Sequence, residues 1–247
     1  ATIAASYAAS IANTYNAQLT TQTLARFGIT PPALLEMRPR VWFNEDLKSK
    51  NFIIPGLIAI IMMVIAALLT SLTIAREWER GTMEQLISTP VKPGELILGK
   101  FLPYFVIGCI DLLIAMAMAQ LIYHVPLRGS LALLLILSAI FLTGALSLGI
   151  FISTAAKNQL MASQLAILMT FLPAFLLSGF AYAIYNMPKA IQVITYIVPA
   201  RYFISILKGI YLKGIGLRVL WTDVFFLILF AFIMVAITSR KFKKKVA

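Results

Sequence analysis

The sequence predicts an all-α fold, that of a polytopic helical membrane protein with five transmembrane helices. Hydrophobic residues make up 61% of the 247 positions, charged residues make up only 12%, and the mean hydropathy is +0.92. No soluble domain of this size needs so much apolar surface. The apolar residues also gather in runs of about 20, the length that a helix needs to cross the hydrocarbon core of a bilayer.

Charge and cysteine content exclude several other classes of protein. The net charge is +12, but the cations lie beside apolar runs and at the C-terminus, not in a soluble basic domain. This placement favours contact with membrane lipid over contact with nucleic acid. The single cysteine, Cys109, excludes an internal disulfide and a cysteine-based metal cluster.

Residues 1–51 differ from the rest of the chain because they contain no span. Apolar side chains recur there at every fourth position among small and polar residues, which predicts a helix with one mildly apolar side that ends near Gly28. A charged passage then leads to the first span. We expect this region to be the end of a larger extracellular domain that begins before Ala1, and residues 52–247 to form the transmembrane domain.

Five nearly uncharged stretches are long enough to cross the bilayer as helices. Asp111 is the one ionisable group within the second stretch, and Pro173 lies within the fourth. Neighbouring helices can satisfy the carbonyl group that such a proline frees, so we expect a kinked span there. The predicted spans cover about 52–74, 101–123, 131–153, 160–180 and 219–239.

A different kind of segment, residues 181–218, separates the last two spans. It holds two short helical patterns, 188–198 and 200–211, which meet at Pro199. Each pattern is too short to cross a bilayer, and the tyrosines around them suit the boundary with water. We therefore expect two short re-entrant helices that dip into the membrane or lie flat on it.

The orientation follows from the placement of Lys and Arg. With five spans, one side of the membrane holds residues 75–100, the loop around Lys157 and the C-terminal tail, with ten Lys or Arg against eleven on the other side. The ten lie in shorter segments next to span ends, where the positive-inside rule applies. We expect that side, including the C-terminus, to be cytoplasmic and the N-terminal region to be extracellular.

The cytoplasmic loop 75–100 predicts a rigid elbow made of two helices and a sharp turn. Gly81 permits a left-handed stop to the first helix. Thr82 with Gln85 forms a capping box, and Pro90 ends the second helix. A charged helix pair held at the surface could dock a soluble partner. The alternative is an ordinary solvated loop that obeys the same capping rules.

Three stretches resemble the permease subunits of ABC-2 type ATP-binding cassette transporters, which share the type V exporter fold. Residues 76–100 read REWERGTMEQLISTPVKPGELILGK and resemble the family's coupling-helix region. Residues 179–214 read GFAYAIYNMPKAIQVITYIVPARYFISILKGIYLKG and resemble its two short extracellular helices, while 41–58, VWFNEDLKSKNFIIPGLI, resemble the lead into the second span. The match is to drug or lipid exporters with a large extracellular domain. Since that family has six spans, we expect the first to precede this chain.

The resemblance implies a lever mechanism with a separate ABC ATPase subunit that binds the ATP and Mg²⁺, while this chain binds no cofactor. The coupling helix seats in a groove of that cytoplasmic subunit, and a second permease copy or a paralogue completes the transporter. The implied ATPase contacts are Arg76, Glu77, Glu79, Arg80, Gly81, Thr82, Glu84, Gln85, Thr89 and Pro90, with Lys157, Asn158 and Gln159 as a second cytoplasmic contact. The implied extracellular lid contains Pro188, Pro199, Arg201, Tyr202 and Phe203.

The sequence offers no catalytic or metal centre of its own. Gly94 to Lys100 fits the first seven positions of a phosphate-binding P-loop, but Phe101 stands where a hydroxyl should hold Mg²⁺. No strand precedes this stretch, and its interior is aliphatic. A lone His124 cannot form a metal site, and no set of His, Asp, Glu and Ser converges on one place. We therefore predict a non-catalytic subunit.

Asp111 and Pro173 are the candidates for the transport path. A carboxylate within a span is costly and points to function, so Asp111 could attract a cationic substrate. The alternative, which the sequence favours slightly, is a protonated or hydrogen-bonded carboxyl group that holds helices together.

The function that these patterns favour is ATP-driven export of a hydrophobic or amphipathic substrate, drug-like or lipid, across a bacterial inner membrane. An apolar lining suits such a substrate better than a sugar polymer. The alternative is a secondary carrier or channel that works without ATP, although such proteins more often place several polar groups at the midplane.

Overall fold

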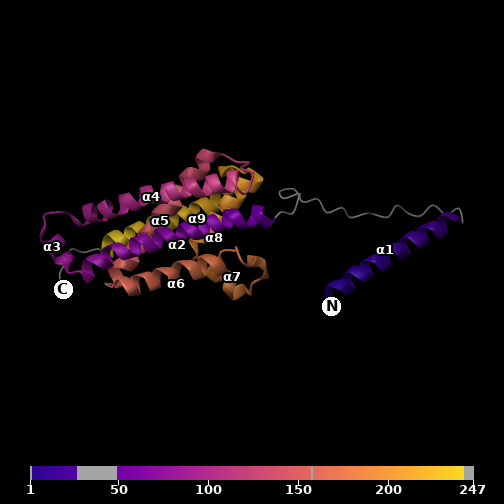
Figure 1. The fold of residues 1–247 in the computed structure, drawn as a ribbon, viewed down its shortest axis with the longest axis horizontal. Coiled ribbons are helices and arrows are strands. Elements are labelled where there is room, and N and C mark those ends of the chain that lie inside the picture. Colours follow the sequence, from indigo (N-terminus) through magenta and orange to yellow (C-terminus); the bar gives the residue numbers. More distant parts are fainter. Residues whose placement is uncertain (1, 27–48, 157, 242–247) are drawn as a thin grey trace. The chain divides into compact units, whose positions relative to one another are not determined.

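A computed structural model describes residues 2–26, 49–156 and 158–241, and within these ranges every regular element is a helix (Figure 1). The chain separates into two compact units, Ala1–Val41 and Trp42–Ala247. In the first unit, the predicted N-terminal helix is present as α1, Thr2–Arg26. Its predicted end near Gly28 and the charged lead-in that follows lie outside the described residues.

The five predicted spans are confirmed as five long apolar helices. The first helix ends later than predicted and the second begins earlier, so both extend into the loop that joins them. Hydropathy marks only the part of a helix that lies in hydrocarbon. The fourth span stops earlier than predicted, where Gly179 takes a positive φ of 82°. The helices are α2 (Ser49–Glu79), α4 (Pro93–Leu121), α5 (Leu131–Ala156), α6 (Gln159–Leu177) and α9 (Leu217–Lys241).

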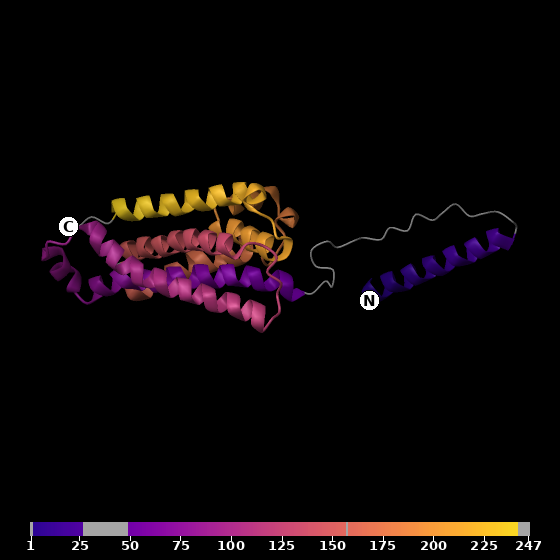
Figure 2. The same cartoon turned by 90° about the horizontal axis from the view of Figure 1, so that it is seen from above.

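The helices α2 and α5 form the centre of the second unit. Half of the most apolar window of each is buried inside the protein, against 17% for α4 and 22% for α6 and α9. Figure 2 shows α2, α4, α5 and α9 running alongside one another. The two central helices touch closely at Gly149, where an added Cβ atom would lie 2.9 Å from the Cα atom of Ala67. Small residues therefore set this helix contact.

Hydrogen bonds join the central helices to each other and to α9. The Thr70 hydroxyl donates to the Leu146 carbonyl at 3.0 Å, and the backbone N–H groups of Ile74 and Ala75 donate to Ser153 at 2.9 and 2.8 Å. The Thr238 hydroxyl of α9 donates to the Ser147 carbonyl of α5 at 2.9 Å. These hydroxyl and N–H groups inside the spans find partners within this chain, as hydrocarbon requires.

The segment between α6 and α9 forms short helices, as predicted. They are η1 (Ile184–Asn186), α7 (Lys189–Thr195), α8 (Pro199–Lys208) and a π-helical turn, η2 (Gly209–Lys213). The axes of α7 and of the α8–η2 segment differ by 83°, so the two do not form one straight span. Most apolar side chains of α7 are exposed, whereas α8 is buried around Phe203, which stacks on Phe141 with ring centroids 4.0 Å apart.

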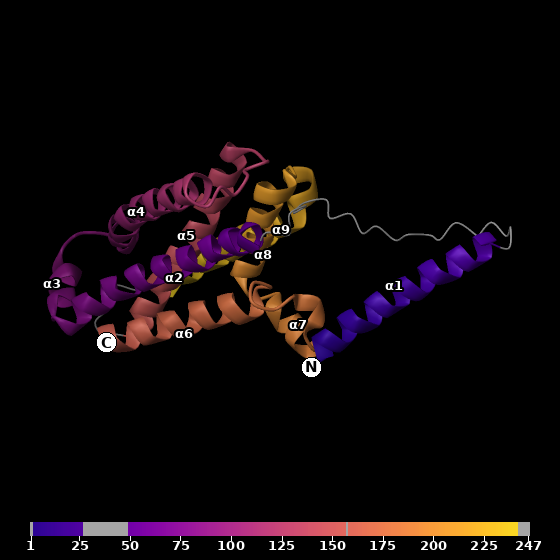
Figure 3. The ribbon, with the colours of Figure 1, turned by 45° about the vertical axis from the view of Figure 1, so that its right-hand side comes forward.

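The short helix α3 (Thr82–Ser88) joins α2 to α4. It lies at one end of the second unit, and α7 lies toward the other (Figures 1 and 3). The last turns of α9 reach the same end as α3. The second unit therefore has an α3 end and, away from it, an aromatic end around α7 and α8.

Candidate functional site

The elbow between α2 and α4 is a short helix between two defined turns. Gly81 has φ 71° and ψ 4°, and an added Cβ would meet no atom within 4 Å, so its left-handed backbone alone explains the glycine. Thr89 is extended, and α4 then begins with Pro93 as its first residue. The predicted left-handed stop at Gly81 is confirmed, and so is the end of the second helix before Pro90.

The predicted capping box of Thr82 and Gln85 is wrong. Gly81 occupies the N-cap position of α3 and provides no side-chain cap. The Thr82 hydroxyl turns back and donates to the Glu77 carboxylate. A hydrogen bond to a charged group is stronger than the bond that Thr82 would accept from a backbone N–H in a capping box. A cap of this kind stands at the start of α4, where the Glu95 carboxylate accepts the Lys92 backbone N–H at 2.9 Å.

Apolar contacts fasten α3 to the helix bundle. Met83 is only 3% exposed and packs in a cluster with Ile74 of α2 and Ile150 of α5, both fully buried. Trp78 and Leu86 cover this cluster. The elbow is therefore a packed part of the fold, and a displacement of α3 would bear directly on α2 and α5.

Polar contacts tie the elbow to two further helices. Lys100 of α4 forms an ion pair with Glu77 at 2.8 Å. Glu79 accepts the backbone N–H and the side-chain amide of Gln159, at 3.0 and 3.1 Å, and the Arg76 Nε atom donates to the Gln159 Oε1 atom at 3.2 Å. The expected coupling residues Arg76, Glu77 and Glu79 thus hold α2 against α4 and α6.

The expected second cytoplasmic contact lies beside this network. Asn158 caps α6, its Oδ1 atom accepting the N–H of Leu160 at 2.8 Å, and Gln159 contacts the end of α2 as described. Lys157 lies outside the described residues. The structure therefore brings two chain segments about 80 residues apart to one place.

The remaining coupling candidates face outward. Arg80, Glu84 and Gln85 have exposed side chains that make no hydrogen bond or ion pair within the part of the chain that the structure describes. Thr89 and Pro90 are also exposed. The ten candidates thus divide into an inner set that positions the elbow and an outer set with exposed side chains.

Two apolar cavities lie among the spans, and they separate the candidates for the transport path. One, of about 760 Å³, lies between α6, α8 and α9 and is lined by Pro173, Pro199 and Tyr202. The other, of about 570 Å³, lies between α2 and α4 and is lined by Asp111 and Lys50. Asp111 and Pro173 therefore do not share a cavity.

Asp111 lines the cavity between α2 and α4. Among the described residues it makes no hydrogen bond or ion pair, although it lies in the interior of a span. An unpaired carboxylate is costly in hydrocarbon, and a cavity at this position could admit water or a polar group that lowers this cost.

The candidate lid residues have different positions. Tyr202 stacks on Phe226 of α9 with centroids 5.0 Å apart, and its hydroxyl donates to the Tyr196 carbonyl at 2.7 Å. Arg201 lies over the Tyr196 ring at 4.0 Å. Phe203 is in the core, and Pro188 is exposed before α7, outside the cavity lining.

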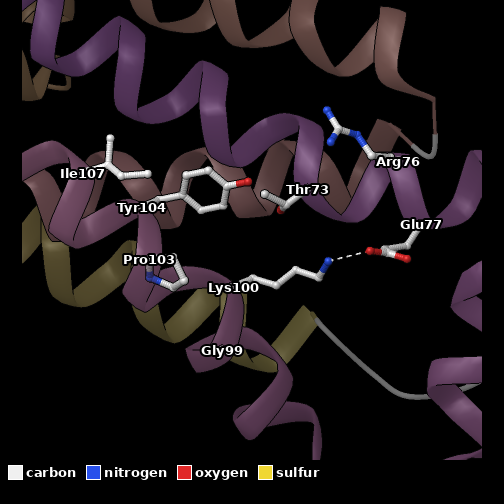
Figure 4. A pocket seen from close by; sticks show the side chains of 8 residues that line it. All are labelled: Thr73, Arg76, Glu77, Gly99, Lys100, Pro103, Tyr104 and Ile107. Atoms are coloured by element: carbon white, nitrogen blue, oxygen red, sulfur yellow. Dashed lines mark hydrogen bonds and ion pairs between the residues drawn. The ribbon is translucent and has the colours of Figure 1, made fainter.

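A third pocket was missed by the sequence reasoning. It has a volume of about 340 Å³, lies between α2 and α4 beside the elbow, and is lined by Lys100, Tyr104 and Thr73 among others (Figure 4). The spacing of Lys100 and Tyr104, one turn apart, was the available signal. The supposed P-loop stretch just before it, Gly94–Lys100, is helical throughout and forms no phosphate-binding loop.

Comparisons with known proteins identify the family. The family described as "ABC-2 family transporter protein" matches residues 1–240. The probable multidrug ABC transporter permease YbhS of Escherichia coli (strain K12) is 45% identical over 218 residues, which cover 88% of this chain and 58% of that protein. The probable multidrug ABC transporter permease YbhR of the same organism is 32% identical over 246 residues, which cover 100% of this chain and 65% of that protein.

A more distant relative comes from a eukaryote. ABC transporter G family member 20 of Dictyostelium discoideum is 25% identical over 218 residues, which cover 87% of this chain and 30% of that protein. The chain spans less than two thirds of the length of each of these relatives. With its five apolar helices, the chain is a multi-pass membrane protein that belongs to the ABC-2 transporter family.

Proposed function

We propose that this chain is the permease part of an ATP-binding cassette exporter, driven by ATP that a separate cytoplasmic subunit hydrolyses. The observation that carries the proposal is the elbow, which is packed onto the bundle by Met83 and presents Arg80 and Glu84 outward. Exposed charges of both signs, Arg80 in the turn and Glu84 on α3, give a docking partner orientation and specificity. The relatives named as multidrug ABC transporter permeases support it.

The contacts of the elbow explain how a push on α3 would reach the spans. Met83 joins α3 to α2 and α5, the Glu77–Lys100 ion pair joins α2 to α4, and Glu79 with Gln159 joins α2 to α6. A packed core transmits displacement because it does not deform continuously. Closure of the ATPase subunits would therefore move several spans together and open the cavities alternately to the two sides of the membrane.

The α3 end is the cytoplasmic end in this account. The tail cations Arg240 and Lys241 lie in the last turn of α9, which reaches that end, and short basic segments beside spans stay on the inner side. The protein would then lie in the bacterial inner membrane, with α7 and α8 as an outer lid. A second copy or a paralogue would complete the translocation path.

The substrate class is hydrophobic or amphipathic. Both large cavities have mainly aliphatic, methionine and aromatic linings, which suit drug-like molecules or lipids. Asp111 and Lys50 add one charge of each sign to the cavity between α2 and α4, which would suit an amphipathic molecule with a polar or charged group. A secondary carrier that needs no ATP is the competing function.

Transport by the protein reconstituted with its ATPase subunit tests the proposal. Glu84→Ala and Arg80→Ala should lower transport per ATP hydrolysed about tenfold, a typical size for the coupling between two sites. Lys92→Gln removes an exposed charge outside the proposed contact set and should leave transport unchanged. Full-rate transport by the permease without the ATPase would favour the carrier, as would undiminished transport in the Glu84 and Arg80 variants.

A further inference from the structure

The pocket between α2 and α4 has the composition of an amphiphile site. At its outer end stand the charged groups Arg76, Glu77 and Lys100, and one turn deeper stand the Tyr104 hydroxyl and Thr73. Figure 4 shows the Tyr104 hydroxyl turned toward Thr73, and the Lys100 ammonium group turned toward Glu77 across the same space. Ile107 forms a deeper, apolar part of the wall. The lining thus changes from charged to hydroxyl-bearing to aliphatic along α4.

Lys100 keeps donors available for a ligand. An ammonium group has three N–H donors, and the described contacts use one of them, for the Glu77 carboxylate at 2.8 Å. The Lys100 side chain is 23% exposed, so its remaining donors are accessible from the pocket. An oxygen atom of a ligand could therefore accept a hydrogen bond from Lys100 without breaking the ion pair of Lys100 with Glu77.

The Tyr104 hydroxyl is a second donor in the pocket. It makes no hydrogen bond within the described residues, although Tyr104 is half-buried and packs against the core. The Thr73 hydroxyl already donates its proton to the Thr70 carbonyl at 2.8 Å and so does not compete for an acceptor. An acceptor atom that enters the pocket could therefore take the proton of the Tyr104 hydroxyl without competition from Thr73.

The charge of the pocket selects an anion. Arg76 and Lys100 against Glu77 leave one net positive charge. Glu77 is compensated by Lys100 and accepts the Thr82 hydroxyl, so its charge is already paired. The unused donors, on Lys100 and Tyr104, suit the acceptor oxygens of a phosphate group. A headgroup with its own ammonium group would be disfavoured by the net positive charge.

The surroundings of the pocket favour a lipid over a soluble anion. The pocket wall continues along α4 into exposed apolar side chains, including Ile107 at 48% and Ile110 at 51% exposed. Of the five spans, α4 has the smallest buried share, 17% of its most apolar window. Acyl chains can therefore lie along α4 while the phosphate occupies the pocket at the level of the membrane surface.

We propose that this pocket binds the phosphate of an anionic phospholipid from the leaflet on the α3 side, with Lys100 and Tyr104 as its donors. Basic pockets between spans near a membrane surface are suited to such headgroups. A bound lipid would bridge α2 and α4 beside the elbow. The proposal does not depend on the ATPase partner, since it concerns this chain and the bilayer alone.

Native mass spectrometry of the detergent-purified protein, titrated with phosphatidylglycerol or with phosphatidylcholine, tests the site. Phosphatidylglycerol should bind more tightly. Lys100→Gln should weaken its binding about fivefold, the effect of losing about 1 kcal/mol from one cation near a lipid phosphate. Tyr104→Phe should weaken it about threefold through loss of one hydrogen bond. Lys100→Arg, which keeps the charge, should retain binding.

Lys92→Gln is the matched control, because it removes a cation of the same loop that does not line the pocket. An equal loss in Lys92→Gln and Lys100→Gln would show non-specific attraction and overturn the site. Equal affinity for the two lipids would also overturn it. Displacement of phosphatidylglycerol by millimolar inorganic phosphate would assign the pocket to a soluble anion instead. Tyr104→Phe leaves the ion pair of Lys100 with Glu77 intact. It therefore tests the site even if the Lys100 variants fail to fold, and unchanged binding in Tyr104→Phe would overturn the role of Tyr104 as a donor.

Discussion

The two ends of the transmembrane unit are held together by different kinds of contact. At the α3 end, α2 is joined to α4 and α6 by an ion pair and amide hydrogen bonds between partly exposed side chains, Glu77 with Lys100 and Glu79 with Gln159. At the α8 end, buried rings join the helices, as in the stack of Phe203 on Phe141. Exposed polar contacts are individually weak, whereas buried rings contribute strongly. The polar links of α2 to α4 and α6 can therefore rearrange while the aromatic end stays fixed.

The largest effect is expected at the aromatic end. Phe203→Ala removes a fully buried ring from the stack with Phe141 and should lower the free energy of unfolding by about 3 kcal/mol. Tyr185→Ala, at a side chain 82% exposed, should change it little. Denaturant unfolding in detergent measures both. Equal stability of the two variants would show that the α8 end is not the fixed one.

The next largest effect is expected where the two central helices meet, between the two ends. Gly149→Ala would place a Cβ atom 2.9 Å from the Ala67 Cα atom and against its carbonyl oxygen, which should cost about 2 kcal/mol of unfolding free energy through overpacking. Gly99→Ala is the matched control, because nothing lies within 4 Å of its added Cβ. If both substitutions are neutral in the same unfolding experiment, the close contact of α2 with α5 is not required.

The smallest effect is expected at the elbow. In a double-mutant cycle, Glu77→Gln and Lys100→Gln should show a coupling free energy below about 1 kcal/mol, since the two side chains are 25% and 23% exposed and solvent screens them. Repeating the cycle at high salt should reduce the coupling further. A coupling free energy as large as the unfolding free energy lost in Phe203→Ala would remove the contrast between the two ends.

The fold was largely predictable because its main signals are local. Uninterrupted apolar runs identified all five spans. Gly81 marked a left-handed turn, and the backbone conformation there, not a lack of space, is the reason for a glycine. The ends of α2 and α4 were not predictable from hydropathy, because a helix that has begun in hydrocarbon continues into water for as long as its own hydrogen bonds are favourable.

The site was predictable only in part, because its contacts join distant segments. The motif marked the elbow, but it did not separate Glu77, which binds Lys100 of the next helix, from Glu84, which faces outward. The choice of Glu77 as the acceptor for Thr82 depends on where the Gly81 turn returns the chain. The separation of Asp111 from Pro173 into two cavities likewise depends on helix packing.

Photo-crosslinking in the assembled transporter tests the proposed role of the elbow most directly. A photoreactive amino acid in place of Glu84 should give an adduct with the ATPase subunit, because the outward face of α3 docks there. The same probe in place of Leu98, which is 63% exposed on α4, should give none with that subunit. An absence of adduct from position 84, or an equal yield from both positions, would contradict the account of α3 as the lever that the ATPase moves.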